Sequence, residues 1–227
     1  MLDWRSGLIG ELERWGASHQ FSVDWSAFAN RWRVLGLLNI LDKRRDEVPG
    51  GNIDGAHRSV LPRVFDEFEL ALPNPAELDA MTLFWHRLPA WPDVKESLAR
   101  LRQRYVVSTL TILSVPLTLA CSKRNGIEWD ALISCEMMDS YKFHPEAYER
   151  GCRLLGYKPE EVMMVAAHNL DLAAAKAIGM RTAFVERSEE WGEEGATAAP
   201  DHVDETFEFD CSAVGLADLA DQLLDAF

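Results

Sequence analysis

The chain has 227 residues, enough for one large domain or two small ones and for a sizeable buried core. Its 48% hydrophobic and 26% charged residues are ordinary for globular proteins and exclude disordered, collagen-like and coiled-coil chains. With 23 basic and 37 acidic residues the formal net charge is −14, so we expect neither nucleic acid nor a membrane surface as a partner. A small anionic substrate would have to be held by local positive charge.

The cysteines and the amino-terminal segment indicate where the protein resides. No Cys-x-x-Cys motif or Cys/His cluster is present, so the sequence predicts structural thiols, with neither disulfides nor a metal site; the cysteines are Cys121, Cys135, Cys152 and Cys211. No apolar run approaches 18 residues, and the charged, helix-patterned start does not resemble a signal peptide. We expect a cytoplasmic protein.

Residues 1–87 carry hydrophobic residues at the 3.6-residue period of helices. Loop residues interrupt the pattern at 49–51 and 73–75. The stripes are Leu8, Ile9, Leu12 and Trp15; Phe28, Trp32, Leu35 and Leu38; and Val60, Val64, Phe68 and Leu72. This pattern predicts an all-helical domain over residues 1–87.

From residue 88 onward, helical stretches alternate with short apolar runs, which is typical of a parallel sheet covered on both faces. An acidic loop over 186–210 holds much of the net charge. The predicted strands are 105–109, 132–134, 162–166 and 182–185, and the predicted helices are 92–104, 145–155, 170–178 and 216–224. The sequence therefore predicts an α/β domain over residues 88–227.

In an open parallel sheet the functional site lies at the carboxyl ends of the strands. Four places qualify: Ser108 and Thr109, Lys142, the stretch 168–171, and the loop after Val185. Each has an ordinary structural explanation when it is considered alone. The hydroxyls could cap a helix, the lysine could be a solvated loop residue, and an aspartate could face a helix dipole. Their order along the chain makes coincidence less plausible.

In that order, these stretches resemble the haloacid dehalogenase superfamily and, over nearly the whole chain, its type II 2-haloacid dehalogenase branch. The helical half is similar to the cap domain of that branch, including residues 28–33. The matching core stretches are Leu88-Pro89-Ala90-Trp91-Pro92-Asp93-Val94, Val107-Ser108-Thr109-Leu110-Thr111, Tyr141-Lys142-Phe143-His144-Pro145-Glu146-Ala147-Tyr148, and Met164-Val165-Ala166-Ala167-His168-Asn169-Leu170-Asp171-Leu172.

The resemblance implies that an aspartate displaces halide from a 2-haloalkanoate, forming an ester that water hydrolyses to a 2-hydroxy acid. It also implies that no cofactor is needed and that homodimers form through the cap. The implied catalytic residues are Lys142, Asp171 and Ser108. The implied substrate-binding residues are Arg33, which faces the departing halide, with Thr109, Tyr148, His168, Asn169 and Trp32.

This sequence lacks the stretch that carries the nucleophilic aspartate in the family that it resembles. In that family the first, central strand ends in a stretch like Phe-Asp-x-x-Gly-Thr, and this sequence begins after it with Leu2-Asp3-Trp4. We therefore expect the chain as given to be inactive, and an internal start codon to be the reason. If the family arrangement is kept, the strands 105–109 and 162–166 should stand about 10 Å apart, about twice the usual spacing.

Two alternatives remain open at this stage. A phosphatase of the same superfamily would need Mg²⁺ held by carboxylates, and the stretch that ends at Asp171 offers one acid where such enzymes usually offer two. The other alternative is a non-catalytic protein, which would be either a binding module that retains the pocket or a truncated product without activity.

Overall fold

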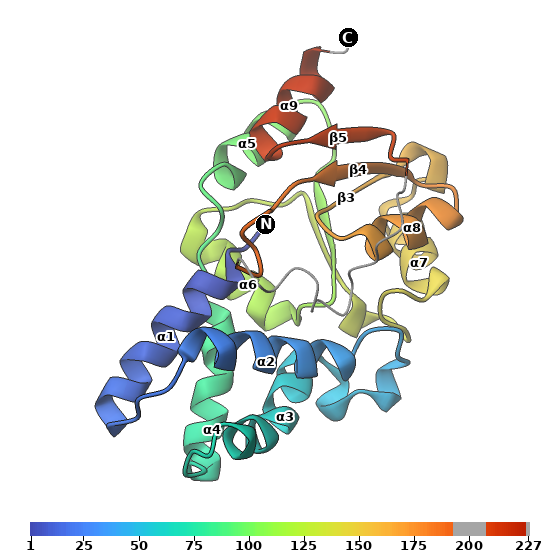
Figure 1. Cartoon of the computed structure of the whole chain (residues 1–227). Helices are drawn as coiled ribbons and strands as arrows, with labels where there is room; N and C mark the ends of the chain where they lie inside the picture. Colours follow the sequence, from blue (N-terminus) through green and yellow to red (C-terminus); the bar gives the residue numbers. More distant parts are fainter. Residues whose placement is uncertain (193–207, 226–227) are drawn as a thin grey trace.

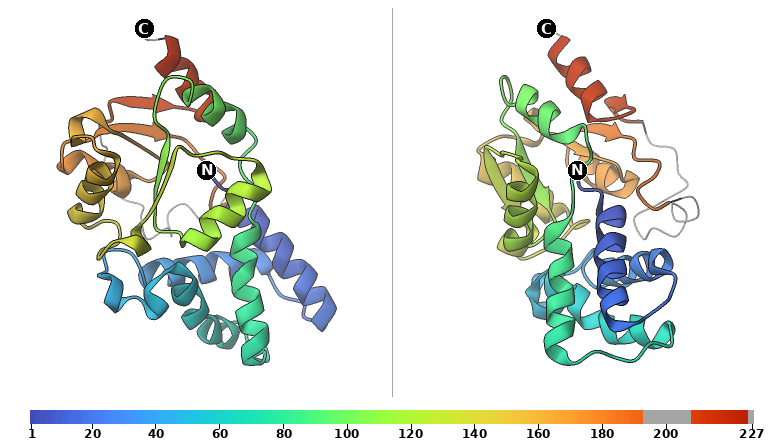
Figure 2. Two further views of the ribbon diagram at one scale, coloured as in Figure 1. Left: turned by 180° about the vertical axis from the view of Figure 1, so that it is seen from behind. Right: turned by 90° about the vertical axis from the view of Figure 1, so that its left-hand side faces the viewer.

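The computed structural model describes residues 1–192 and 208–225. The helices of the first third of the chain pack together as one layer, and every described strand follows residue 107 (Figure 1). The predicted division at residue 87 stays a prediction. Figure 2 shows the same arrangement from behind and from the side. No described helix is both long and apolar enough to cross a bilayer.

Four α-helices form the first layer, and each begins at an Asp or Asn whose side chain accepts a hydrogen bond from a first-turn amide. These N-caps are Asp3, Asp24, Asn52 and Asn74. Two 3₁₀ turns precede α3 and a third follows α4. The elements are α1 (Trp4–His19), α2 (Trp25–Leu38), η1 (Arg45–Glu47), η2 (Pro49–Gly51), α3 (Ile53–Glu67), α4 (Pro75–Thr82) and η3 (Leu83–Arg87).

The remainder of the chain alternates helices and parallel strands, as predicted. The elements are α5 (Val94–Leu101), β1 (Ser108–Thr111), α6 (Val115–Asn125), β2 (Ala131–Ser134), η4 (Cys135–Met137), α7 (Pro145–Leu155), η5 (Pro159–Glu161), β3 (Met163–Ala166), α8 (Asn169–Ala177), β4 (Arg181–Val185), β5 (Cys211–Ala213) and α9 (Leu216–Asp225). The cysteines are free thiols, as predicted. Most of the predicted acidic loop, residues 193–207, lies outside the described residues.

The strands form two separate parallel sheets. β1 pairs with β2, and β4 pairs with both β3 and β5. Within the described residues, β1 and β3 each pair on one edge only, and both line a cavity of about 830 Å³. The two strands do not pair directly with each other, and the predicted spacing of about 10 Å stays a prediction.

The first strand starts later than predicted, at Ser108 instead of at residue 105. The Tyr105 amide still donates to the Leu101 carbonyl at the end of α5 (2.9 Å), and the Tyr105 hydroxyl donates to the Leu223 carbonyl. Parallel pairing begins only where Ser108 stands opposite Ala131. The end of the preceding helix therefore takes up residues that an apolar run alone assigns to the strand.

The layers are joined by two adjacent segments at residues 1–3 and 88–91. Leu2 and Ala90 form an antiparallel bridge, and the Asp3 amide donates to the Pro89 carbonyl (2.9 Å).

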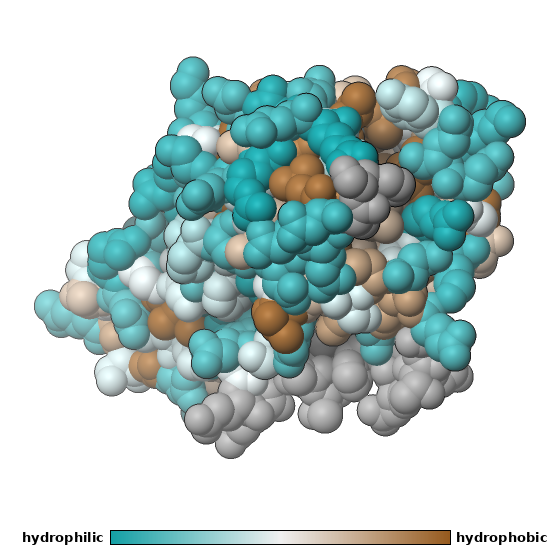
Figure 3. Space-filling view, turned by 90° about the horizontal axis from the view of Figure 1, so that it is seen from above, coloured by the Kyte–Doolittle hydropathy of each residue, from teal (hydrophilic) through white to brown (hydrophobic). Residues whose placement is uncertain are grey.

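Seen from above in Figure 3, the surface is largely hydrophilic, and its hydrophobic residues lie in separate groups. The interior of the helical layer is rich in aromatic side chains, including Phe28, Trp32 and Trp85.

His57 of α3 is a buried polar residue in this aromatic core. Its ring stacks on Trp85 with the ring centroids 4.0 Å apart, and neither ring nitrogen has a hydrogen-bond partner. A Cβ at Gly36 would lie 2.2 Å from His57 Cδ2, so glycine is needed for this close helix approach. Burial, with the charges of Arg33 and His86, holds the pKa of His57 well below its usual range.

This depressed pKa predicts that acid weakens the fold. The unfolded state binds a proton near pH 6.5 while folded His57 does not, so its contribution is complete above pH 6.5 and is lost as the pH falls below it. We expect the unfolding free energy to drop by up to about 1.4 kcal/mol per pH unit between about pH 6.5 and 5. Urea titrations of His57→Leu should show a flatter dependence in this range; an unchanged slope would contradict the assignment.

Candidate functional site

Lys142, Tyr148 and Asp171 meet in a buried cluster. The Lys142 ammonium donates to Asp171 Oδ2 (2.7 Å) and the Tyr148 hydroxyl donates to Asp171 Oδ1 (2.7 Å). All three side chains are buried, and Lys142 and Asp171 line the cavity between β1 and β3. These residues were predicted to share one site, and the structure brings them into direct contact.

Neighbouring elements fix each member of the cluster. Tyr148 stands in the first turn of α7 and Asp171 in the first turn of α8. Lys142 lies in a loop that pairs with the helical layer. There the Asp42 amide donates to the Lys142 carbonyl (2.6 Å), and Arg44 forms an antiparallel bridge with Ser140. The lysine is thereby held at the junction between the two layers.

The protonation states within the cluster follow from its burial. Burial raises the pKa of Tyr148 first of all, and the Asp171 charge raises it further, so the phenol stays a donor at neutral pH. Asp171 accepts from both neighbours and is paired with the Lys142 charge. A charge-assisted pair with this geometry holds the ammonium in a fixed direction at the cavity wall.

Arg33 supplies a second positive group at the cavity wall from the helical layer. The residue is only 9% exposed, and its guanidinium lies over the Trp4 and Trp85 rings at 5.6 and 5.7 Å from their centroids. Arg33 and Lys142 both line the cavity. The local positive charge that an anionic substrate requires is therefore present, although the chain as a whole has a negative net charge.

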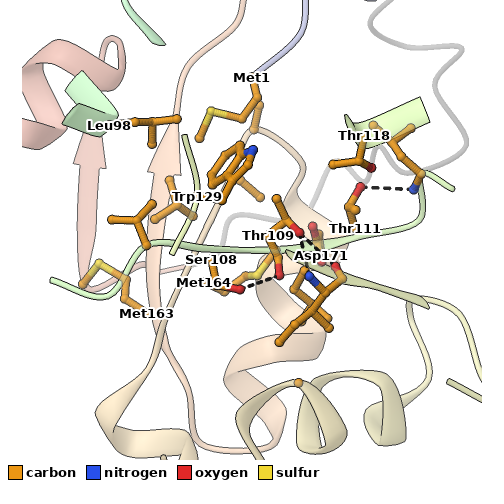
Figure 4. Close-up of a pocket in the computed structure, with 18 of the residues that line it drawn as sticks. Met1, Leu98, Ser108, Thr109, Thr111, Thr118, Trp129, Met163, Met164 and Asp171 are labelled. Atoms are coloured by element: carbon orange, nitrogen blue, oxygen red, sulfur yellow. Dashed lines mark hydrogen bonds between the residues drawn. The ribbon is translucent and has the colours of Figure 1, made fainter. Parts of the chain in front are cut away.

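We predicted that Ser108 and Thr109 lie at the carboxyl end of the first strand. In the structure they begin that strand. Both line the cavity, and Figure 4 shows them beside Met164 and Asp171. The Ser108 hydroxyl donates to the Thr109 carbonyl (3.0 Å), and the Thr109 hydroxyl exchanges hydrogen bonds with the Ile133 backbone. Their place at the carboxyl end of the strand is thus corrected, because the apolar run continues to Leu113.

Ser114, three residues after the end of β1, is a polar residue that was not predicted to join the strand to the helical layer. It caps α6, accepting from the Leu117 amide, and its hydroxyl donates to Asp54 of α3 (2.6 Å). This serine therefore ties the carboxyl end of the strand to the helical layer. The signal was available, since Ser114 stands two residues before Pro116, and a serine before a helix-starting proline is a helix N-terminus pattern.

The other predicted pocket residues divide into two groups. Tyr148 reaches the cavity wall only through Asp171, whereas His168 lines the cavity itself and contacts Glu190 (Nε2 to Oε2, 2.9 Å). Trp32 is fully buried, donates to the His57 carbonyl and is not part of the cavity wall, and its substrate-binding role stays a prediction. Asn169 begins α8 and likewise is not part of the wall.

Within residues 1–192 and 208–225, no three His, Cys, Asp or Glu side chains are grouped so that they could hold a metal ion.

Comparisons with known proteins agree with this geometry. A family model described as haloacid dehalogenase-like hydrolase matches residues 17–179. The crystal structure of the L-2-haloacid dehalogenase PA0810 superimposes with a TM-score of 0.85 at 34% identity, covering 99% of this chain and 94% of that one. That of the defluorinating L-2-haloacid dehalogenase Rha0230 does so with a TM-score of 0.85 at 35% identity, covering 98% and 90%.

A curated relative gives a shorter match. Haloacetate dehalogenase H-2 of Moraxella sp. (strain B) is 34% identical over 106 residues, which is 44% of this chain and 46% of that protein. The match thus spans about half the length of the curated relative. The predicted α/β fold with its parallel sheets is confirmed by the structure and by the family match. The chain belongs to the haloacid dehalogenase-like hydrolase family.

Proposed function

We propose that the protein replaces the halogen of a short 2-haloalkanoate with a hydroxyl group from water. The observation that carries the proposal is the buried Lys142–Asp171–Tyr148 cluster, which stands with Arg33 at one cavity. The similarity to two L-2-haloacid dehalogenases over nearly the whole chain supports the same substrate class. The ammonium and the guanidinium would hold the substrate anion and meet the departing halide.

The attacking carboxylate is not supplied by the described residues of the cavity wall. Three of these residues are acidic, and each is engaged: Asp171 with Lys142 and Tyr148, Glu190 with His168, and Glu161 with the Lys158 amide. We propose that a further strand between β1 and β3 carries the nucleophile. Its ammonium partner would be Lys142, and without such a strand the chain would be inactive.

The proposed chemistry has two steps. A carboxylate oxygen attacks C2 of the substrate, the new C–O bond forms as the carbon–halogen bond breaks, and halide leaves with the bonding electron pair. Water then attacks the carbonyl carbon of this ester, which releases the 2-hydroxy acid and restores the carboxylate. Both steps move negative charge next to Lys142, and a fixed positive group in a water-poor site stabilises such charge.

Parallel release assays separate this function from the phosphatase alternative. The protein, carrying a strand that ends in aspartate, is incubated with (S)-2-chloropropionate in metal-free buffer and with a generic phosphate ester and Mg²⁺. We expect chloride release in the first assay and only background phosphate in the second. Phosphate release without chloride release would overturn the proposal, and activity in neither assay would favour the non-catalytic alternative.

A further inference from the structure

The loop that follows β4 joins the two layers at the cavity wall. It is anchored at its start by Arg187, which donates to both oxygens of Asp93 (2.9 and 3.0 Å). Farther along, the Trp191 carbonyl accepts from Asn30 of α2 (3.3 Å), and the buried Trp191 ring meets Trp4 edge-on with the centroids 4.9 Å apart. Between these anchors lies Glu190, which is not part of the Lys142–Asp171–Tyr148 cluster described above.

Glu190 is held from both layers at once. Its Oε1 accepts from the Trp4 indole N–H of α1 (3.1 Å), and its Oε2 meets His168 Nε2 at the start of α8 (2.9 Å). The side chain is only 13% exposed. Trp4 is also one of the two rings that support the Arg33 guanidinium. The Glu190 carboxylate therefore contacts His168, which lines the cavity. It also contacts Trp4, whose ring lies beneath the Arg33 guanidinium at the same cavity.

The charge of Glu190 determines the roles of its neighbours. Burial raises the pKa of Glu190, but the His168 hydrogen bond and the charges of His168, Arg33 and the terminal amino group lower it below its ordinary value. Ionised at neutral pH, the carboxylate only accepts hydrogen bonds, so His168 Nε2 must carry the proton that it shares. The tautomer and orientation of the imidazole are fixed in this way.

We propose that Glu190 is a positioning residue of the site, setting the His168 ring and, through Trp4, the Arg33 guanidinium for a 2-haloalkanoate anion. This inference rests on the proposed function for the identity of the ligand. A purely electrostatic role predicts the opposite effect. A negative charge at the wall of an anion site weakens anion binding, so its removal alone would strengthen binding. The two roles therefore differ in sign.

The variant Glu190→Gln tests the positioning role in the full chain without any ligand. The two contacts use different carboxylate oxygens, and glutamine replaces one of them with an NH2 group, which cannot accept a hydrogen bond from the Trp4 indole or from a protonated His168 Nε2. We expect the NMR resonance of the Trp4 indole N–H or that of the His168 ring nitrogens to move, with His168→Gln providing the assignment. Glu189→Gln, a change at the exposed neighbouring residue, serves as the control and should leave both unchanged. Identical Trp4 and His168 resonances in wild type and Glu190→Gln would overturn the proposal.

Binding of (S)-2-chloropropionate, followed by calorimetry, provides the second readout. We expect Glu190→Gln to bind roughly tenfold more weakly than wild type, as loss of a hydrogen bond to a charged group predicts, and Glu189→Gln to bind like wild type. Tighter binding by Glu190→Gln would show that the residue acts by charge alone. If the wild-type chain does not bind this anion, the proposed function fails, while the resonances still decide the positioning role.

Discussion

Adding a β-strand that ends in an aspartate to the amino end of the chain is expected to raise chloride release from (S)-2-chloropropionate by about 10⁴-fold or more, the scale on which removal of a nucleophile lowers enzymatic rates. The physical reason is the cavity between β1 and β3, which is lined by an open edge of each strand. An inserted strand would pair with the open backbone edges on both sides and place its carboxylate near Lys142. Halide release at steady state measures the effect.

The same addition should stabilise the fold, because backbone donors and acceptors along both edges gain partners. A control addition with asparagine in place of the aspartate should give the same gain in thermal stability without chloride release. Equal activity of the chain with and without the added strand would refute the assignment of the nucleophile to that strand. Loss of stability on addition would show that the two sheets do not accept a strand between them.

Removing the Lys142 ammonium should destabilise the protein by about 3–5 kcal/mol, because Lys142→Met leaves the Asp171 carboxylate buried beside Tyr148 alone. The loss of a buried charge partner, and not the loss of packing, is the cause, since methionine retains most of the lysine stem. Urea unfolding monitored by circular dichroism measures the change. Binding of 2-chloropropionate should be lost at the same time.

The double variant Lys142→Met with Asp171→Asn separates the two effects. Its asparagine is neutral and still offers an oxygen to the Tyr148 hydroxyl, so most of the lost stability should return, whereas anion binding should not. If the double variant is as unstable as Lys142→Met, the destabilisation does not arise from the unpaired Asp171 charge. If it binds 2-chloropropionate normally, Lys142 is not part of the anion site.

Most of the fold follows from local patterns in the sequence. The helix at 145–155 was predicted to the residue, because proline starts it and Gly156 ends it with a positive φ of 78°. The strand predicted at 105–109 begins three residues later than predicted, because Tyr105 is held by the last turn of the preceding helix. Periodicity identifies apolar runs, but only pairing partners set where a strand begins.

The site was predictable where chemistry and strand order agree. Lys142 and Asp171 were found because the carboxyl ends of parallel strands converge, and Tyr148 was added by the family resemblance alone. Trp32 stands beside Arg33 in the sequence but is buried in the core, where it donates to the His57 carbonyl, and its substrate-binding role stays a prediction. The loop after Val185 was named as a candidate place, but Glu190 within it was not singled out, because its partners, Trp4 and His168, are distant in sequence.

The most direct test of the account is the mass of the intact protein, carrying the added strand, after acid quenching during turnover of (S)-2-chloropropionate. The account predicts a mass increase equal to one carboxyethyl group, located by peptide fragmentation on the aspartate of the added strand and missing from its asparagine form. Chloride release without any covalent adduct, or an adduct on Asp171 or Glu190, would contradict it.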